Sequence, residues 1–177
     1  MIGDDLAAAT DDGGKTWVPC MERLPNPQGL HLYTIAHHGK TWVVAGEQGL
    51  LMRSRHDGAG YESLDSPFKR SFFTAMATRN GGFVLAGLLG NACLIESGDA
   101  SVTPIVLPAP LTILSSTELR DGRVMLLAQG GRLLVSSDGG AEFAEQLTPQ
   151  RGLLTSLAEA ADGGLVATSL GGVARLS

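Results

Sequence analysis

Two glutamates, one tyrosine and four histidines are the side chains of this sequence that could do chemistry. Glu118 and Glu159 are candidates for the paired carboxylates of glycoside hydrolysis. Tyr33 could supply a phenolic nucleophile, but no carboxylate neighbours it and no arginine recurs on the strands predicted around it. Solvated charges at strand ends explain both glutamates better. We therefore expect no catalytic residue and no enzymatic activity.

The histidines and cysteines do not form a metal-binding pattern. His37 and His38 are adjacent and point apart in strand geometry, so one metal ion does not bind both easily. His31 and His56 stand alone. Cys20 and Cys93 are too few for a disulfide framework, and we expect two buried free thiols. The sequence thus predicts no metal and no cofactor.

An eight-residue pattern occurs twice in full and once with several positions substituted. It reads TDDGGKTW at Thr10–Trp17, SSDGGAEF at Ser136–Phe143 and SRHDGAGY at Ser54–Tyr61. A hydroxyl and a carboxylate two residues apart can bond local backbone N–H groups, glycines supply a positive φ, and the aromatic residue begins the next strand. We therefore expect a turn-forming role, not a catalytic one, for Asp12 and Asp138. The predicted structural residues are Thr10, Asp12, Gly14, Trp17, Ser54, Gly58, Tyr61, Ser136, Asp138, Gly140 and Phe143.

The pattern recurs with a period of 40 to 44 residues, if Glu96 marks a degenerate copy and Ser177 the last one. A period near forty with several short strands per unit is typical of a propeller blade. The chain is predicted to be one domain, 1–177, with repeats at approximately 1–28, 29–69, 70–110, 111–151 and 152–177.

Within each repeat, apolar runs separated by Asn-Gly, Asp-Gly and other glycine turns predict four antiparallel strands, numbered from inner to outer. No segment has an uninterrupted helical period, so the fold class is all-β: a β-propeller of about four four-stranded blades with offset termini. One hydroxyl recurs on each inner strand, and we interpret it as a packing position that bonds a neighbouring backbone. These hydroxyls belong to Thr34, Thr74, Ser115 and Thr155.

The two ends of the chain both carry a predicted third strand. The sequence opens with a third strand near 6–9 and a fourth near 17–20, and it closes after a third strand at Ser177. Three arrangements are compatible with these ends. They are a four-bladed ring with a loose end, a fragment of a larger ring, and one half of a homodimeric ring.

Charge and hydropathy exclude several classes of protein. The 177 residues carry a formal net charge of −5, which argues against a nucleic-acid partner. Prolines interrupt the longest apolar stretches, so no membrane span is predicted, and the acidic start of the chain does not read as a signal peptide. In a propeller, the connections between blades emerge on one face. We expect a partner-binding basic face there, made by Arg23, Lys69, Arg70 and Arg151.

The eight-residue pattern resembles the Asp-box (BNR) turn of β-propellers. With the text at 46–54 and 129–140, the chain further resembles the photosystem II assembly and stability factor family, including its bacterial relatives; Gly98–Ser101 departs most from the pattern. This resemblance implies a non-enzymatic scaffold for a protein or peptide partner, often extracytoplasmic, in a periplasm or lumen. Since Asp-box propellers include sialidases, a sialidase-like or other glycan-active propeller is one alternative. A structural repeat segment of a larger propeller is the second.

Overall fold

The computed structural model describes residues 1–4, 6–98, 101–146 and 153–176, and these form an all-β protein. They fold into five antiparallel sheets of three or four strands, called blades one to five in chain order. The predicted fold class is thereby confirmed. Helical structure in the described ranges is limited to three short 3-10 turns: η1 (Met21–Arg23), η2 (Glu47–Gly49) and η3 (Leu88–Gly90).

Each blade is a meander in which strands consecutive in sequence pair side by side. Blade one contains β1 (Ile2–Gly3), β2 (Leu6–Ala9) and β3 (Val18–Pro19). Blade two contains β4 (Leu32–His38), β5 (Thr41–Gly46), β6 (Leu51–Ser54) and β7 (Glu62–Ser63). Blade three contains β8 (Phe72–Ala77), β9 (Phe83–Gly87), β10 (Ala92–Ile95) and β11 (Val102–Pro104). Blade four contains β12 (Ile113–Glu118), β13 (Val124–Ala128), β14 (Arg132–Ser136) and β15 (Ala144–Gln146). Blade five contains β16 (Leu154–Glu159), β17 (Leu165–Ser169) and β18 (Gly172–Leu176).

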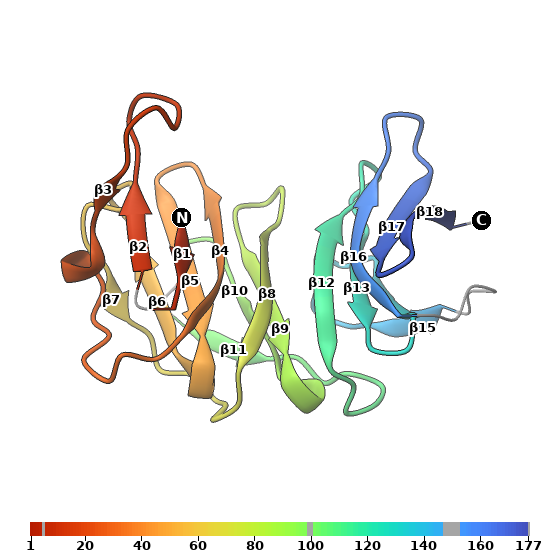
Figure 1. Ribbon diagram of the computed structural model, residues 1–177. Helices are drawn as coiled ribbons and strands as arrows, with labels where there is room; N and C mark the ends of the chain where they lie inside the picture. Colours follow the sequence, from red (N-terminus) through yellow and green to blue (C-terminus); the bar gives the residue numbers. More distant parts are fainter. Residues whose placement is uncertain (5, 99–100, 147–152, 177) are drawn as a thin grey trace.

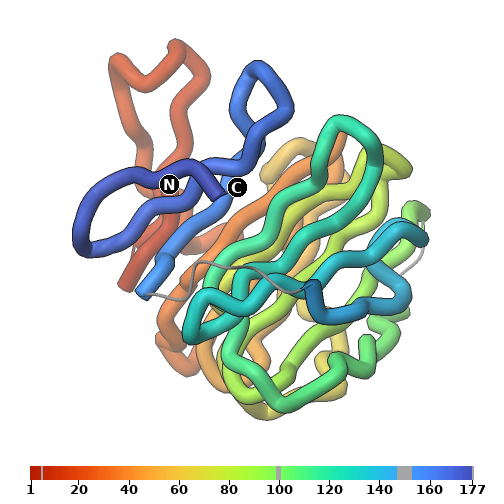
Figure 2. The backbone as a smooth tube through the Cα atoms, turned by 90° about the vertical axis from the view of Figure 1, so that its right-hand side faces the viewer, coloured from red at the N-terminus to blue at the C-terminus, as the bar shows by residue number. Residues whose placement is uncertain are grey.

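The blades follow one another along an open arc, and the ring is not closed (Figures 1 and 2). Figure 1 shows the N-terminus and the C-terminus at opposite ends of this arc. The inner strands β4, β8, β12 and β16 adjoin one another in this order. Blade one begins one strand earlier than the sequence predicts, because Ile2–Gly3 pairs with β2 as a second strand.

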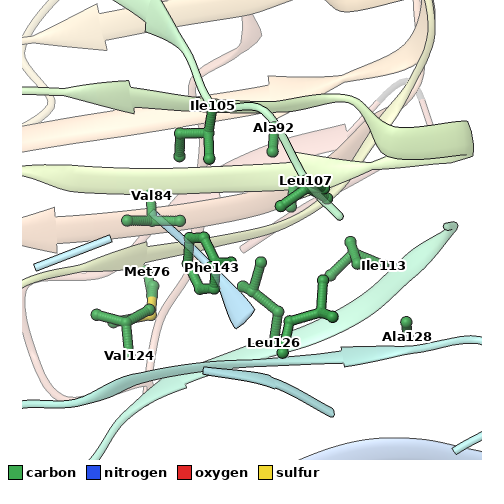
Figure 3. Packing of buried hydrophobic residues seen from close by; sticks show 12 residues of the cluster. Met76, Val84, Ala92, Ile105, Leu107, Ile113, Val124, Leu126, Ala128 and Phe143 are labelled. Atoms are coloured by element: carbon green, nitrogen blue, oxygen red, sulfur yellow. The ribbon is translucent and has the colours of Figure 1, made fainter. Parts of the chain in front are cut away.

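Apolar side chains fill the junctions between blades, where the strands are buried on both faces. Figure 3 shows the junction of blades three and four, in which the Phe143 ring lies between Val84 and Leu126. Separate clusters fill the other three junctions. Cys20 and Cys93 are buried free thiols, as predicted, and burial raises the pKa of the Cys93 thiol to about 12.

Hydrogen bonds of the predicted inner-strand hydroxyls connect neighbouring inner strands. The Thr34 and Ser115 hydroxyls accept hydrogen bonds from the N–H groups of Ala75 and Leu157 on the next inner strand, at 2.9 and 3.3 Å. The Thr74 hydroxyl bonds that of Ser116 at 2.7 Å. The interpretation of these positions as bonding a neighbouring backbone is therefore confirmed for Thr34 and Ser115, whereas Thr74 bonds a side chain of the next inner strand.

In blade five the hydroxyl at this register position belongs to Ser156, not to the predicted Thr155. Ser156 pairs with Thr168 as Ser115 pairs with Leu127. Ser156 stands 41 residues after Ser115, so a count of 40 residues stops one residue short, at the bulge residue Thr155. Thr155 instead bonds the Thr168 hydroxyl of its own blade at 2.9 Å.

The degenerate copy of the pattern is displaced in the same way. Ile95 pairs with Phe83 as Ser54 pairs with Trp42, so Ile95 and not Glu96 stands at the hydroxyl position of blade three. Ile95 is buried and cannot accept the hydrogen bonds that a hydroxyl accepts. The last marker, Ser177, lies outside the described residues.

Candidate partner-binding surfaces

In the Thr10–Trp17 and Ser136–Phe143 turns, the hydroxyl and the carboxylate both accept hydrogen bonds from backbone N–H groups of the same turn. The Thr10 and Ser136 hydroxyls accept from the N–H groups of Gly14 and Gly140 at 2.9 and 2.8 Å. Asp12 Oδ1 accepts from the N–H groups of Lys15 and Thr16, and Asp138 Oδ1 from those of Ala141 and Glu142, at 2.9 to 3.1 Å. These carboxylates are bound within their own turns.

Hydrogen bonding lowers the pKa of both carboxyl groups, because the bonds stabilise their charged form. The pKa of Asp12 falls to about 2, chiefly through the Thr16 backbone N–H and then the Thr16 hydroxyl. The pKa of Asp138 is lowered chiefly by the Ser136 hydroxyl. A carboxylate this acidic is a poor general acid or base near neutral pH.

The third turn, Ser54–Tyr61, keeps only part of this network. The Ser54 hydroxyl still accepts from the Gly58 N–H at 3.1 Å. His56 stands where the other turns have aspartate, and the neighbouring Asp57 adopts φ 57° and accepts from Trp42 Nε1 at 2.9 Å. The Tyr61 ring packs against the core between blades one and two.

Glu118 and Glu159 connect neighbouring blades through hydrogen bonds to arginine residues. Glu118 accepts from the Arg79 N–H at 2.9 Å and from Arg79 Nε at 3.1 Å. Glu159 accepts from the Arg120 N–H at 2.7 Å. Arg79 also donates to the carbonyls of Leu119 and Arg120. We call these contacts the arginine latches.

The other residues considered for chemistry are also engaged in local contacts. His37 stacks on Trp42 with ring centroids 4.6 Å apart, and His31 Nδ1 lies 3.3 Å from Asp4. Tyr33 contacts the rings of His31 and Phe73 edge-on, and burial raises the pKa of its hydroxyl. Within the described ranges, no three histidine, cysteine or acidic side chains gather closely enough to hold a metal ion.

A small pocket of about 140 Å³ opens between blades two and three. It is lined by residues that include His38, Arg53, Arg55, Phe83 and Ser97. Arg53 is buried and binds Glu62 through Nη2 at 2.7 Å, and this contact lowers the pKa of the Glu62 carboxyl. Arg53, which lines the pocket, is therefore already paired with an acidic side chain.

Three of the four predicted basic residues lie in the described part of the chain. Lys69 and Arg70 are exposed in the connection that leads into β8, and the Arg70 carbonyl accepts from Asn91 Nδ2 at 2.8 Å. Arg23 is the last residue of η1, and its Nε lies 3.8 Å from Glu22 Oε1. The Arg23 carbonyl accepts a hydrogen bond from the Tyr61 N–H. Arg151 lies outside the described residues. The structure thus brings Lys69 and Arg70 together and places Arg23 beside the Ser54–Tyr61 turn.

The described residues contain no helix long and apolar enough to cross a membrane. The sequence matches no protein-family model and no curated protein. Similarity is found among solved structures. YCF48 bound to a D1 peptide is similar with a TM-score of 0.76 and 17% identity, over 98% of this chain and 58% of that one. YCF48 from Cyanidioschyzon merolae gives a TM-score of 0.71 and 18% identity, over 97% of this chain and 60% of that one.

An enzyme also has a similar structure. Virginiamycin B lyase from Staphylococcus aureus gives a TM-score of 0.69 and 15% identity, over 85% of this chain and 56% of that one. The chain therefore spans a little over half the length of these structures. At such identities the likeness shows the fold alone, and that fold is the β-propeller.

Proposed function

We propose that this protein is a non-enzymatic propeller scaffold, similar to an assembly factor, that binds a peptide or protein partner. One observation carries the proposal: Lys69 and Arg70 stand exposed side by side in the connection between blades two and three, and neither forms an ion pair with a described residue. An acidic chain with such a cationic site attracts acidic segments. Arg23 and Arg151 are proposed as further cations of this basic face.

Several observations favour this function over catalysis. The carboxylates of the two full turns and of the arginine latches are already bound, so they offer no acid–base pair among the described residues. We assign these turns as Asp-boxes with a structural role, on the strength of their hydrogen bonds. The structure of YCF48 with a D1 peptide shows that a propeller of similar fold can bind a peptide. The proposal includes an extracytoplasmic location, which the family resemblance suggests.

The test is binding of a fluorescein-labelled hexaglutamate peptide, followed by fluorescence polarisation at low salt. We expect measurable affinity that Arg70→Glu and Arg151→Glu each reduce several-fold, while hexalysine does not bind. Unchanged affinity in both variants would remove the basic face from the proposal. Turnover of a fluorogenic sialoside that disappears in Tyr33→Phe would instead establish the glycan-active alternative.

Open faces at the two ends of the arc favour a second candidate function, a structural segment whose end blades are covered by further blades. Trp17 is 46% exposed although its counterpart Phe143 is 8% exposed, and Val173 is 72% exposed although its counterpart Leu133 is 2% exposed. A second copy could cover both faces and complete a ring. Light scattering over a dilution series distinguishes an 18.4 kDa monomer from such a homodimer.

A further inference from the structure

Each inner strand of blades two to five carries a β-bulge at the same place. The ladders shift register between Leu32 and Thr34, and at the corresponding places in β8, β12 and β16. A bulge inserts one extra residue and turns its side chain away from the regular alternation. In order along the arc, the inserted residues are Tyr33, Phe73, Leu114 and Thr155.

Three consecutive inserted residues are apolar and form a row across blades two to four. The Tyr33 and Phe73 rings meet edge-on with centroids 5.7 Å apart. The hydrogen bond between Thr74 and Ser116 holds β8 and β12 at the same level, so Leu114 continues the row. Tyr33 is exposed, and Phe73 and Leu114 are half-buried. This row therefore presents apolar surface that the core does not use.

A leucine in left-handed conformation stands beside the row. Leu89 in η3 has φ 52° and ψ 46°, and its side chain is 52% exposed. The corresponding residues of blades two and four, Gln48 and Gly130, also have positive φ, at 53° and 81°, so this turn is left-handed in all three blades. What distinguishes Leu89 is that it places a large apolar side chain, half exposed, at a position where the other two blades have glutamine and glycine.

The Leu89 turn joins the apolar row to the exposed cations. The N–H of Leu88 donates to the Ser71 carbonyl at 3.0 Å, and Asn91 Nδ2 donates to the Arg70 carbonyl. On its other side, the Leu89 N–H donates to the Thr112 hydroxyl at 3.3 Å, two residues before Leu114. Hence Leu89 lies between the start of β8, where Lys69 and Arg70 stand, and the start of β12.

Charge differs along the row. The carboxylates of Asp4 and Glu47 lie near Tyr33 at the blade-two end, whereas Lys69 and Arg70 precede Phe73 in the middle of the row, at the start of blade three. An extended segment lying along the row meets carboxylates at the Tyr33 end and cations beside Phe73. This asymmetry favours a segment whose acidic residues lie toward Arg70, and it sets the direction of binding.

We propose that Tyr33, Phe73, Leu89 and Leu114, here called the apolar rim, bind an aromatic or branched aliphatic side chain of an extended acidic peptide, with its carboxylates beside Lys69 and Arg70. The proposal rests on the peptide-binding function proposed above. It adds the requirement for an apolar anchor, which charge attraction alone does not need. Edge-on aromatic contacts and branched side chains suit such an anchor.

Two fluorescein-labelled peptides of equal charge provide the test, one with the sequence Glu-Glu-Trp-Leu-Glu-Glu and one with alanine in place of tryptophan and leucine. We expect the first to bind at least tenfold more tightly in fluorescence polarisation. Leu89→Gly should remove at least fivefold of the affinity for the first peptide and leave the second unchanged. This variant relieves the left-handed leucine, so its thermal stability should not fall. Tyr33→Ala should act in the same direction.

Leu170→Gly is the matched control, because Leu170 is an exposed leucine in the β17–β18 hairpin, outside the row. It should leave the affinity for both peptides unchanged. Equal affinity of both peptides, lowered equally by Arg70→Glu and insensitive to Leu89→Gly, overturns the apolar rim and leaves the basic face standing. Absence of binding by either peptide overturns the proposed function itself, and the rim with it.

Discussion

The Thr10–Trp17 and Ser136–Phe143 turns share the hydrogen bonds from their backbone N–H groups but have different surroundings. Blade three packs against the second turn, so that the Phe143 ring is buried between blades, while Trp17 at the end of the arc is half exposed and donates from Nε1 to its own Gly14 carbonyl at 3.1 Å. Local residue types thus suffice to form the turn. The contribution of the turn to the stability of the whole protein depends on the neighbouring blade.

Truncation of the two aromatic rings should give the largest contrast. Phe143→Ala removes a buried ring from the core between blades three and four, and we expect a loss of about 3–5 kcal/mol in the free energy of unfolding. Trp17→Ala should cost about 1 kcal/mol, because much of the ring already contacts water. Urea denaturation followed by circular dichroism measures both. Equal losses would contradict the difference in environment.

Addition of a methyl group at the paired glycines sharpens the same contrast. Gly14 and Gly140 have φ of 89° and 100°, so alanine strains the backbone at both positions, by about 1 kcal/mol. A Cβ at Gly140 would also lie 2.4 Å from Val84 Cγ2, and such overpacking costs about 1–3 kcal/mol more. Gly140→Ala should therefore lower the urea midpoint clearly further than Gly14→Ala. Val84→Ala should restore part of the loss in Gly140→Ala and none in Gly14→Ala.

The blades and their turns could be predicted from the sequence because their signals are local. Asn80-Gly81, Asp121-Gly122 and Asp162-Gly163 each place a glycine with positive φ between the inner strand and the second strand of a blade, and apolar runs mark the strands on either side. These signals hold wherever the blade lies in the arc. The confirmed all-β class follows from them.

Features that depend on contacts between blades were not predictable in the same way. Thr155 and Ser156 offer adjacent hydroxyls in the sequence, and only the strand pairing shows that Ser156 holds the register position. Glu118 and Glu159 looked like solvated strand ends because their arginine partners stand about forty residues away in sequence. The left-handed Leu89 shares its conformation with the aligned residues Gln48 and Gly130, and three different residue types at one position give no sequence signal for it.

Acid should destabilise both turns, but only loss of the Ser136–Phe143 turn should lower the stability of the whole protein. The pKa of Asp12 is lowered from 3.8 to about 2 and that of Asp138 is also lowered, so each charged carboxylate stabilises the folded state above the unfolded pKa. This stability is lost as pH falls from about 4 toward 2. Asp138→Asn should flatten the fall in the global urea midpoint over this range. Asp12→Asn should change mainly local amide exchange in residues 10–17, and an equal effect on the global midpoint would contradict the comparison.

Loss of one arginine latch should give the smallest effect, and it compares the middle of the arc with its end. The Arg79 side chain donates from Nε to Glu118 and from Nη2 to two carbonyls of blade four, but it is half exposed, so solvent screens the ion pair. We expect Arg79→Ala to cost about 0.5–1 kcal/mol at low salt. Arg120→Ala at the junction of blades four and five removes the hydrogen bond from Arg120 Nη1 to the Ala161 carbonyl and keeps the backbone N–H bond to Glu159. It should leave the global free energy of unfolding nearly unchanged, because blade five is covered on one side only and can separate locally. Arg79→Lys is the control, since it keeps the charge but loses the planar group that reaches both carbonyls. Urea denaturation with and without 0.5 M salt separates the two contributions: a loss in Arg79→Ala that salt abolishes assigns the latch to charge, and a loss that persists in salt and in Arg79→Lys assigns it to the carbonyl contacts.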